Sequence, residues 1–174
     1  MARAAVISRV GRDFITHLEG GAHPTAYQDQ AGIWTVGVGH VLTRSELMSG
    51  KIGLTMYVPW RDGLDAEQLE DLFQQDLRPV EAAIQRFVRV YLMQNQVDAL
   101  ASWIFNVGVE AFYGSTLLKR LNAADFRAVP EEMTKWIYAG GKILEDLKYR
   151  RSREVGLWNA LPEGAPPSAT PQEV

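Results

Sequence analysis

Residues 19–40 read EGGAHPTAYQDQAGIWTVGVGH, and this stretch decides the fold of the chain. The apolar residues that precede it recur at helical spacing and predict a helix over residues 6–18: Ile7, Val10, Phe14 and Leu18. Gly20 and Gly21 can adopt the left-handed backbone that closes a helix. Glu19 is therefore a carboxylate at the C-terminal end of a helix, where the helix dipole disfavours its ionised form.

The second half of the stretch is typical of strands. Its strand-forming residues are Tyr27, Ile33, Trp34, Thr35, Val36 and Val38. Residues 30–32 between them predict a turn. Gly37 and Gly39 alternate along the second strand, a pattern that often marks a close approach of backbone or ligand.

The rest of the chain is predicted to be mainly helical. Capping sequences at residues 43–46 and 65–68 predict a brief helix and then a long one to about residue 88, which Pro79 is expected to kink or interrupt. Residues 50–63 are expected to form a loop. Further helices are expected over residues 94–107, 115–122, 125–137 and 145–161, with a break at Gly140 and Gly141.

These elements predict an α+β fold that is mostly helical, with residues 1–161 as a single domain. We expect a small β-containing N-terminal lobe at about residues 13–64, a connecting helix at about 65–88 and a helical C-terminal lobe at about 92–161. A cleft between two such lobes would suit a polymer. Residues 162–174 are rich in proline and are expected to form a disordered tail.

The composition excludes several classes of protein. The net charge of −3 gives no global attraction to nucleic acid or anionic lipid, and the absence of cysteine excludes a disulfide framework. Three scattered histidines form no zinc-binding pattern, so neither a metal nor another cofactor is expected. The first residues show no apolar run of signal-peptide or transmembrane length, and no stable membrane insertion is expected.

Two carboxylates differ in their surroundings in the way that cleavage of a glycosidic bond requires. One carboxyl must deliver a proton to the leaving oxygen, and a second must activate water or attack the sugar, so the two need different environments. Glu19 lies beside apolar neighbours at a helix end, whereas Asp29 lies in a polar segment open to solvent. The residues alone leave a structural alternative open, in which Glu19 caps its helix and Asp29 forms an Asx turn.

Residues 19–40 resemble the active-site motif of the phage lysozymes of glycoside hydrolase family 24, which include the lysozyme of T-even phages and many endolysins. The family pattern is Glu-Gly, then Ala-Tyr-x-Asp, then Gly-x-x-Thr-x-Gly-x-Gly-His, and all three parts occur here in that order. Two later blocks, within residues 94–122 and 136–151, resemble the C-terminal lobe of the same family. The resemblance covers about residues 13–161 and implies a lysozyme-like fold.

The resemblance implies an endolysin that hydrolyses the β-1,4 bond between N-acetylmuramic acid and N-acetylglucosamine in peptidoglycan. Glu19 matches the family's general acid, Asp29 its second carboxylate and Thr35 the hydroxyl that helps to hold the attacking water. An inverting route, in which Asp29 and Thr35 present water to the far face of the sugar, is favoured.

The resemblance also implies supporting residues. Positions that line the family's substrate cleft are matched by Val41, Phe105 and Ser115. Arg150 falls where the family places an arginine near the catalytic glutamate, and His40 is expected to form an ion pair with Asp76.

The chain departs from the family pattern in two places. Residues 22–25 look stretched, with one residue more between Glu19 and Asp29 than the family usually has, which leaves the alignment of His23 open. Leu92 and Met93 replace the threonine that normally caps the next helix, so that this helix start is expected to be weaker.

Two other functions stay open on the sequence alone. A catalytically silent peptidoglycan-binding module would need the stretched loop to spoil the geometry of the two carboxyls. A nucleic-acid binder would use the bases gathered in residues 115–153, but the whole chain is acidic, so no nucleic-acid partner is expected. The expected partner is a glycan strand bound by a monomer. The expected location is the host cytoplasm until a separately encoded holin opens the membrane, and then the periplasm and cell wall.

Overall fold

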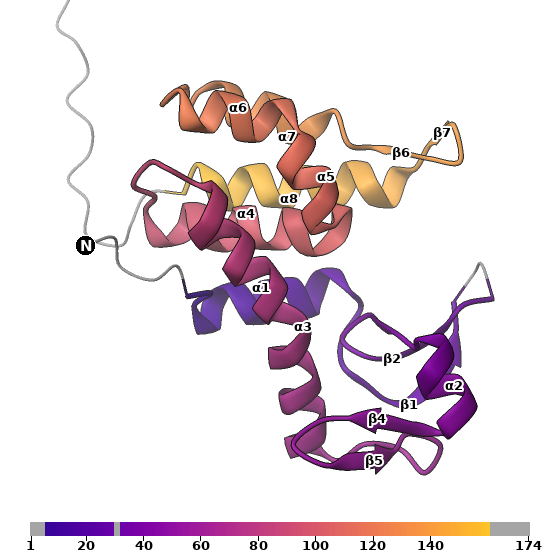
Figure 1. The fold of residues 1–174 in the computed structure, drawn as a ribbon. Coiled ribbons are helices and arrows are strands. Elements are labelled where there is room, and N and C mark those ends of the chain that lie inside the picture. Colours follow the sequence, from indigo (N-terminus) through magenta and orange to yellow (C-terminus); the bar gives the residue numbers. More distant parts are fainter. Residues whose placement is uncertain (1–5, 30–31, 161–174) are drawn as a thin grey trace, which may run out of the picture.

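The computed structural model describes residues 6–29 and 32–160, which form two lobes joined by a long helix (Figure 1). Its helices and small antiparallel sheets confirm the predicted α+β fold. The middle of the turn predicted at residues 30–32 and the tail predicted at residues 162–174 lie outside the described residues.

The smaller lobe is built from short strands. A three-stranded antiparallel sheet has the order β1 (His23–Gln28), β2 (Trp34–Gly37) and β3 (His40–Val41). The helix α2 (Arg44–Ser49) and a hairpin of β4 (Lys51–Gly53) and β5 (Tyr57–Pro59) complete the lobe. Its core consists of Val36, Leu42, Ile52, Val58, Trp60, Leu64 and Leu72.

The β4–β5 hairpin shows that the prediction of a loop over residues 50–63 was wrong. Ile52 and Val58 pair across the hairpin, and both are buried in the smaller core. Each strand has only three residues, which is too short to show the alternation of apolar and polar residues from which strands are predicted.

The helix α3 (Ala66–Phe87) connects the lobes and contributes to both cores, with Leu72 in the smaller core and Leu77 in the larger. The predicted capping box is present, since Asp65 Oδ1 accepts from the Gln68 N–H at 2.9 Å and Gln68 Oε1 accepts from the Asp65 N–H at 3.0 Å. Pro79 lies inside α3 and does not interrupt it. Packing of apolar residues on either side of Pro79 in the larger core offsets the cost of the missing N–H.

The larger lobe is helical. Its elements are α1 (Arg9–Leu18), α4 (Gln94–Val107), α5 (Val109–Gly114), α6 (Thr116–Asn122), α7 (Ala128–Thr134), the hairpin of β6 (Tyr138–Ala139) and β7 (Lys142–Ile143), and α8 (Glu145–Trp158). The helix predicted over residues 125–137 is thus shorter and gives way to a hairpin that turns at Gly140 and Gly141, both with positive φ. At the start of α4, Met93 forms no side-chain cap, although Gln96 Oε1 accepts from its N–H at 3.0 Å.

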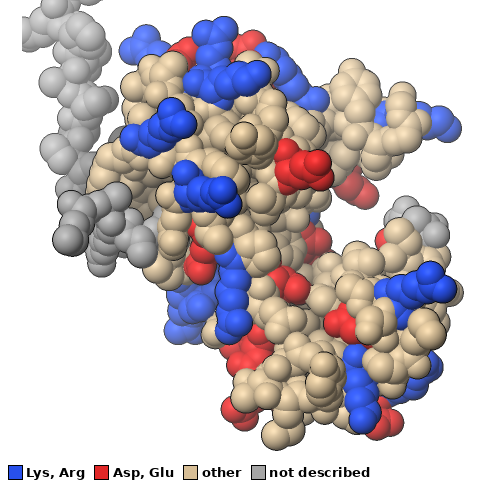
Figure 2. Space-filling view, in the orientation of Figure 1, with Lys and Arg blue, Asp and Glu red and all other residues tan. Residues whose placement is uncertain are grey.

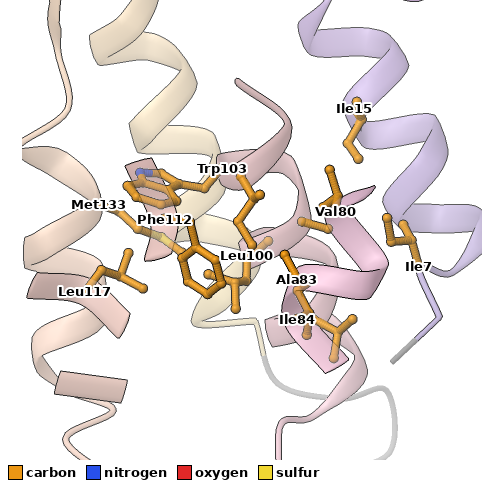
Figure 3. Packing of buried hydrophobic residues seen from close by; sticks show 14 of the residues in the cluster. Ile7, Ile15, Val80, Ala83, Ile84, Leu100, Trp103, Phe112, Leu117 and Met133 are labelled. Atoms are coloured by element: carbon orange, nitrogen blue, oxygen red, sulfur yellow. The ribbon is translucent and has the colours of Figure 1, made fainter. Parts of the chain in front are cut away.

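The N-terminal helix belongs to the larger lobe. Ile7 and Ile15 lie in the larger core, and α1 packs on α4 (Figure 3). The predicted lobe boundary at residue 13 therefore falls inside a helix that packs on the C-terminal half of the chain. Glu19, directly after α1, is consequently held by the helical lobe, while residues 23–41 form the sheet of the smaller lobe.

Candidate active site

Glu19 is the residue at which the chain leaves the helical lobe. It is the C-cap of α1, and its N–H donates to the Ile15 carbonyl at 3.0 Å. Gly20 and Gly21, with φ of +84° and +106°, then redirect the chain into the smaller lobe. The Glu19 side chain is 19% exposed, and its Oε1 lies 2.6 Å from Nη2 of Arg150.

The backbone of the smaller lobe approaches this carboxylate at Gly39. A Cβ atom at Gly39 would lie 2.9 Å from Glu19 Oε2, and the residue has φ of +70°, a conformation that side chains disfavour. Glycine is therefore required here for two separate reasons. Of the two alternating glycines, Gly39 thus marks a close approach of backbone to the Glu19 carboxylate, whereas a Cβ at Gly37 would meet Leu72.

Gly39 also lines a groove between the lobes. The groove is lined by Gly39, His40, Val41, Asp76, Pro79, Val80, Ile104, Phe105, Gly108 and Val109. These residues come from both lobes and from α3, and Figure 2 shows the molecule hollowed between the lobes. Val41 and Phe105, which the sequence placed in a substrate cleft, lie on opposite lobes of this one groove.

Asp29 closes the turn between β1 and β2. Its Oδ1 accepts from the Ile33 N–H at 2.8 Å, and its own N–H donates to the Ile33 carbonyl at 3.0 Å. Its side chain is exposed to solvent. Asp29 therefore holds the turn through its backbone and one carboxylate oxygen, and its setting is open and polar, unlike that of Glu19.

Thr35 lies in the middle of the sheet. It pairs with Tyr27 of β1 on one side and with Val41 of β3 on the other, and directly opposed residues share one face of a sheet. Because Val41 lines the groove, Thr35 lies on the groove face of the sheet. Thr35 is 5% exposed, and its hydroxyl donates to the Ile33 carbonyl at 3.3 Å.

The strand β1 changes register within the segment that comparison with the family pattern suggested is stretched, between Glu19 and Asp29. His23 pairs with Gly37 and Tyr27 pairs with Thr35, so the register of β1 shifts between these two pairs. The rings of His23 and Tyr27 lie 4.7 Å apart on the same strand. Beyond this shift Tyr27 lies directly opposite Thr35, near the end of β1 that leads to Asp29.

Ser115, the third residue expected to line the cleft, is occupied elsewhere. It is 5% exposed, and its hydroxyl accepts from the Leu118 N–H at 3.0 Å and donates to the Phe112 carbonyl at 2.7 Å. It is thus the N-cap of α6 and is not among the residues that line the groove.

Comparisons with known proteins identify the family of the chain. The family model described as phage lysozyme matches residues 17–154. The chain belongs to the phage lysozyme family. It is 41% identical to the SAR-endolysin of Escherichia phage Mu over 85% of this chain and 78% of that protein, and 40% identical to the endolysin of Salmonella phage P22 over 86% of this chain and 97% of that protein.

Solved structures of related proteins share the fold of this phage lysozyme. A mutant of P22 lysozyme is similar with a TM-score of 0.71 and 38% identity, covering 88% of this chain and 98% of that one. The muramidase domain of SpmX from Asticaccaulis excentricus is similar with a TM-score of 0.71 and 31% identity, covering 90% of this chain and 99% of that one. The chain is therefore a glycosidase of the lysozyme type with a lysozyme-like fold.

His40 of this phage lysozyme ties the groove's edge to α3. Its Nδ1 lies 3.0 Å from Asp76 Oδ1, and its Nε2 lies 3.4 Å from Oε2 of Glu46, the residue that completes the capping box of α2. Burial alone would lower the pKa of His40, but the hydrogen bond and charge of Asp76, together with Glu46, outweigh burial and raise it. The histidine therefore acts as a junction between β3, α2 and α3.

A buried charge cluster lies on the other side of Glu19, in α8. Arg150, Arg151 and Glu154 are 6%, 1% and 0% exposed. Of these three residues, the family resemblance implied a place near Glu19 for Arg150 alone. The spacing of Arg150, Arg151 and Glu154, at i, i+1 and i+4 along a helix, is the signal that could have indicated the other two.

Neither a metal nor a membrane enters this description. Within residues 6–29 and 32–160, no group of acidic, histidine or cysteine side chains could hold a metal ion. Over the same residues, no helix combines the length and apolar character needed to cross a bilayer.

Proposed function

We propose that this phage lysozyme hydrolyses the β-1,4 bond between N-acetylmuramic acid and N-acetylglucosamine in peptidoglycan, with the catalytic chemistry of glycoside hydrolase family 24 as in the T-even phage lysozymes. The observation that carries the proposal is the groove, because the backbone that lines it at Gly39 approaches Glu19 from the smaller lobe. A glycan strand lying in the groove would contact Val41 on one lobe and Phe105 on the other.

Glu19 is the general acid in this proposal. Its side chain is half-buried at the C-terminus of α1, and its Oε1 lies 2.6 Å from Nη2 of Arg150. The N–H groups of Arg150 Nη2 make no well-directed hydrogen bond within the described residues, so the contact is electrostatic. In the proposed reaction this carboxyl gives its proton to the leaving oxygen of the glycosidic bond.

Asp29 and Thr35 activate the water. The carboxylate of Asp29 is exposed to solvent, and Thr35 lies on the groove face of the adjacent strand. Water held by these two groups would attack the sugar from the face opposite Glu19, which gives inversion at the anomeric carbon.

The place of action follows from the substrate. We propose that the protein acts as a monomer on the cell wall in the periplasm, which it reaches from the host cytoplasm when a separately encoded holin opens the inner membrane. Expression of this chain alone should then leave cells intact until the membrane is permeabilised, and lysis without permeabilisation would contradict this route.

The release of reducing ends from purified sacculi tests the proposal. The wild-type chain should release muramic acid reducing ends, and Glu19→Gln should lower the rate by about 10³-fold. Pull-down by sacculi without release of reducing ends would instead support a silent wall-binding module. Glu19→Gln protein that releases ends at the wild-type rate would show that the acid is misassigned.

A further inference from the structure

The buried charges of α8 form a chain that ends at Glu19. Glu154 Oε1 lies 3.3 Å from Nε of Arg150, whose Nη2 lies 2.6 Å from Glu19. Glu154 Oε2 lies 3.2 Å from Nε of Arg151. One arginine is thus shared between two carboxylates, and a second arginine balances the inner carboxylate.

Side chains of α4 hold these buried charges in place. The Ser102 hydroxyl donates to Glu154 Oε1 at 2.9 Å, and Arg151 Nη2 donates to Asn106 Oδ1. Arg151 and Glu154 are among the largest fully buried side chains of the described structure. Their positions are therefore set by the packing of α4 on α8 rather than by solvent.

Among the described residues, several buried polar atoms of the cluster lack a hydrogen bond, which a purely structural role does not explain. Glu154 Oε2, Arg150 Nη2, and Nε and Nη1 of Arg151 are buried without a directed hydrogen bond in the part of the chain that the structure describes. Burial raises the pKa of Glu154 against the attraction of Arg151 and Arg150, and burial lowers the pKa of Arg151. Apolar side chains of similar volume would stabilise such a position as well or better, so the charges need another explanation.

We propose that Glu154 and Arg151 are positioning residues which, through Arg150, set the net charge that Glu19 experiences and so the pH range over which it keeps its proton. The inference rests on the proposed role of Glu19 as the general acid. With both residues present, two carboxylates face two guanidinium groups. The negative charge of Glu154 then partly neutralises the positive charge of Arg150. Without Glu154, the full charge of Arg150 would act on Glu19 and favour loss of its proton.

Several other charged groups around the site are engaged in pairs that the test leaves unchanged, and His17, in the last turn of α1, is also left unchanged. Towards the smaller lobe, His40 is bound to Asp76 and Glu46. On the packed helices, α4 has Asp98, which binds Ser8 at the far end of α1, and α7 has Glu131 and Glu132, both paired with Lys135.

The test compares Glu154→Gln, Arg151→Gln and the double variant. The measurement is the pH profile of kcat/KM, whose alkaline limb reports loss of the proton from the general acid. Glu154→Gln leaves one excess positive charge, so its alkaline limb should move down by about one pH unit. Arg151→Gln leaves one excess negative charge and should move the limb up by a similar amount, and the double variant should return it towards the wild-type position.

Glu132→Gln is the matched control. Glu132 is also poorly exposed and paired with a cation, Lys135 at 2.7 Å, but it lies in α7 outside the cluster. Its removal should leave the limb in place. Circular dichroism checks that each variant is folded, and if Glu154→Gln does not fold, the opposed shifts of Arg151→Gln and the double variant carry the test.

Two outcomes would overturn the inference. One is loss of activity in both single variants with no opposed displacement of the limb, and the other is a double variant that simply adds the two losses. If Glu19→Gln is inactive, either result rejects only the role of the cluster and leaves the proposed function standing. An active Glu19→Gln rejects the proposed function itself, so the two failures are distinguishable.

Discussion

The two lobes give the same chemical group two different environments. Glu19 belongs to the helical lobe, where burial, a helix C-terminus and the charges of α8 surround its carboxylate. Asp29 belongs to the smaller lobe, where it lies exposed in a turn and is held by hydrogen bonds to Ile33. One environment is built by residues far apart in the sequence and the other by residues four apart.

Under the proposed function, this difference in environment is what lets Glu19 act as the acid and Asp29 as the base. The environment of Glu19 can be adjusted by a distant residue such as Glu154, whereas the Asp29 carboxylate is held by the nearby Ile33 N–H. The lobes meet at Gly39, so both environments depend on how the sheet is held against the helices. Four substitutions test this contrast.

Asp29→Asn removes the charge of the exposed carboxylate and should cause the largest loss of activity among these substitutions. Asparagine keeps an oxygen that can accept from the Ile33 N–H, so the turn and the melting temperature should be preserved. Loss of the base should lower kcat at least about 100-fold. The measurement is release of reducing ends together with Tm. An active Asp29→Asn would mean that Asp29 serves only the turn.

Gly39→Ala tests the contact between the two environments. The added Cβ would lie 2.9 Å from Glu19 Oε2, so the carboxylate must move, and kcat should fall about 10- to 100-fold. Gly141→Ala is the control, because Gly141 also has positive φ, at +75°, but a Cβ there meets nothing within 4 Å. Equal losses of activity in the two variants would assign the effect to backbone strain alone.

The contrast also explains what the sequence could and could not predict. The α3 capping box and the close approach of backbone at Gly39 follow from local patterns, and they could be predicted from neighbouring residues. The three-residue strands at residues 51–53 and 57–59 were missed because a short strand has no period. The cluster around Glu154 joins α4, α8 and Glu19, so only the packing of distant segments reveals it.

Ser115→Ala separates fold from substrate contact on the helical side. The hydroxyl caps α6 and is buried, so its loss should cost about 1–2 kcal/mol and lower Tm by about 3–6 °C. KM should stay within about twofold of wild type. Phe105→Ala is the comparison, since Phe105 lines the groove and its loss should raise KM several-fold. A raised KM in Ser115→Ala would instead indicate that Ser115 contacts the substrate.

His40→Asn has the smallest expected effect and reports on the junction that holds the sheet to α3. The folded-state pKa of His40 is raised above 6.5, chiefly because Asp76 outweighs burial, so its contribution to stability is complete below about pH 6.5 and is lost as the pH rises through the folded-state value. His40→Asn should therefore lower Tm by about 2–4 °C at pH 6 and by less at pH 9. His17→Asn, at an exposed position of α1, is the control and should show no such pH dependence. A deficit of equal size at both pH values would mean that packing, rather than the charge of the imidazolium between Asp76 and Glu46, joins the smaller lobe to the connecting helix.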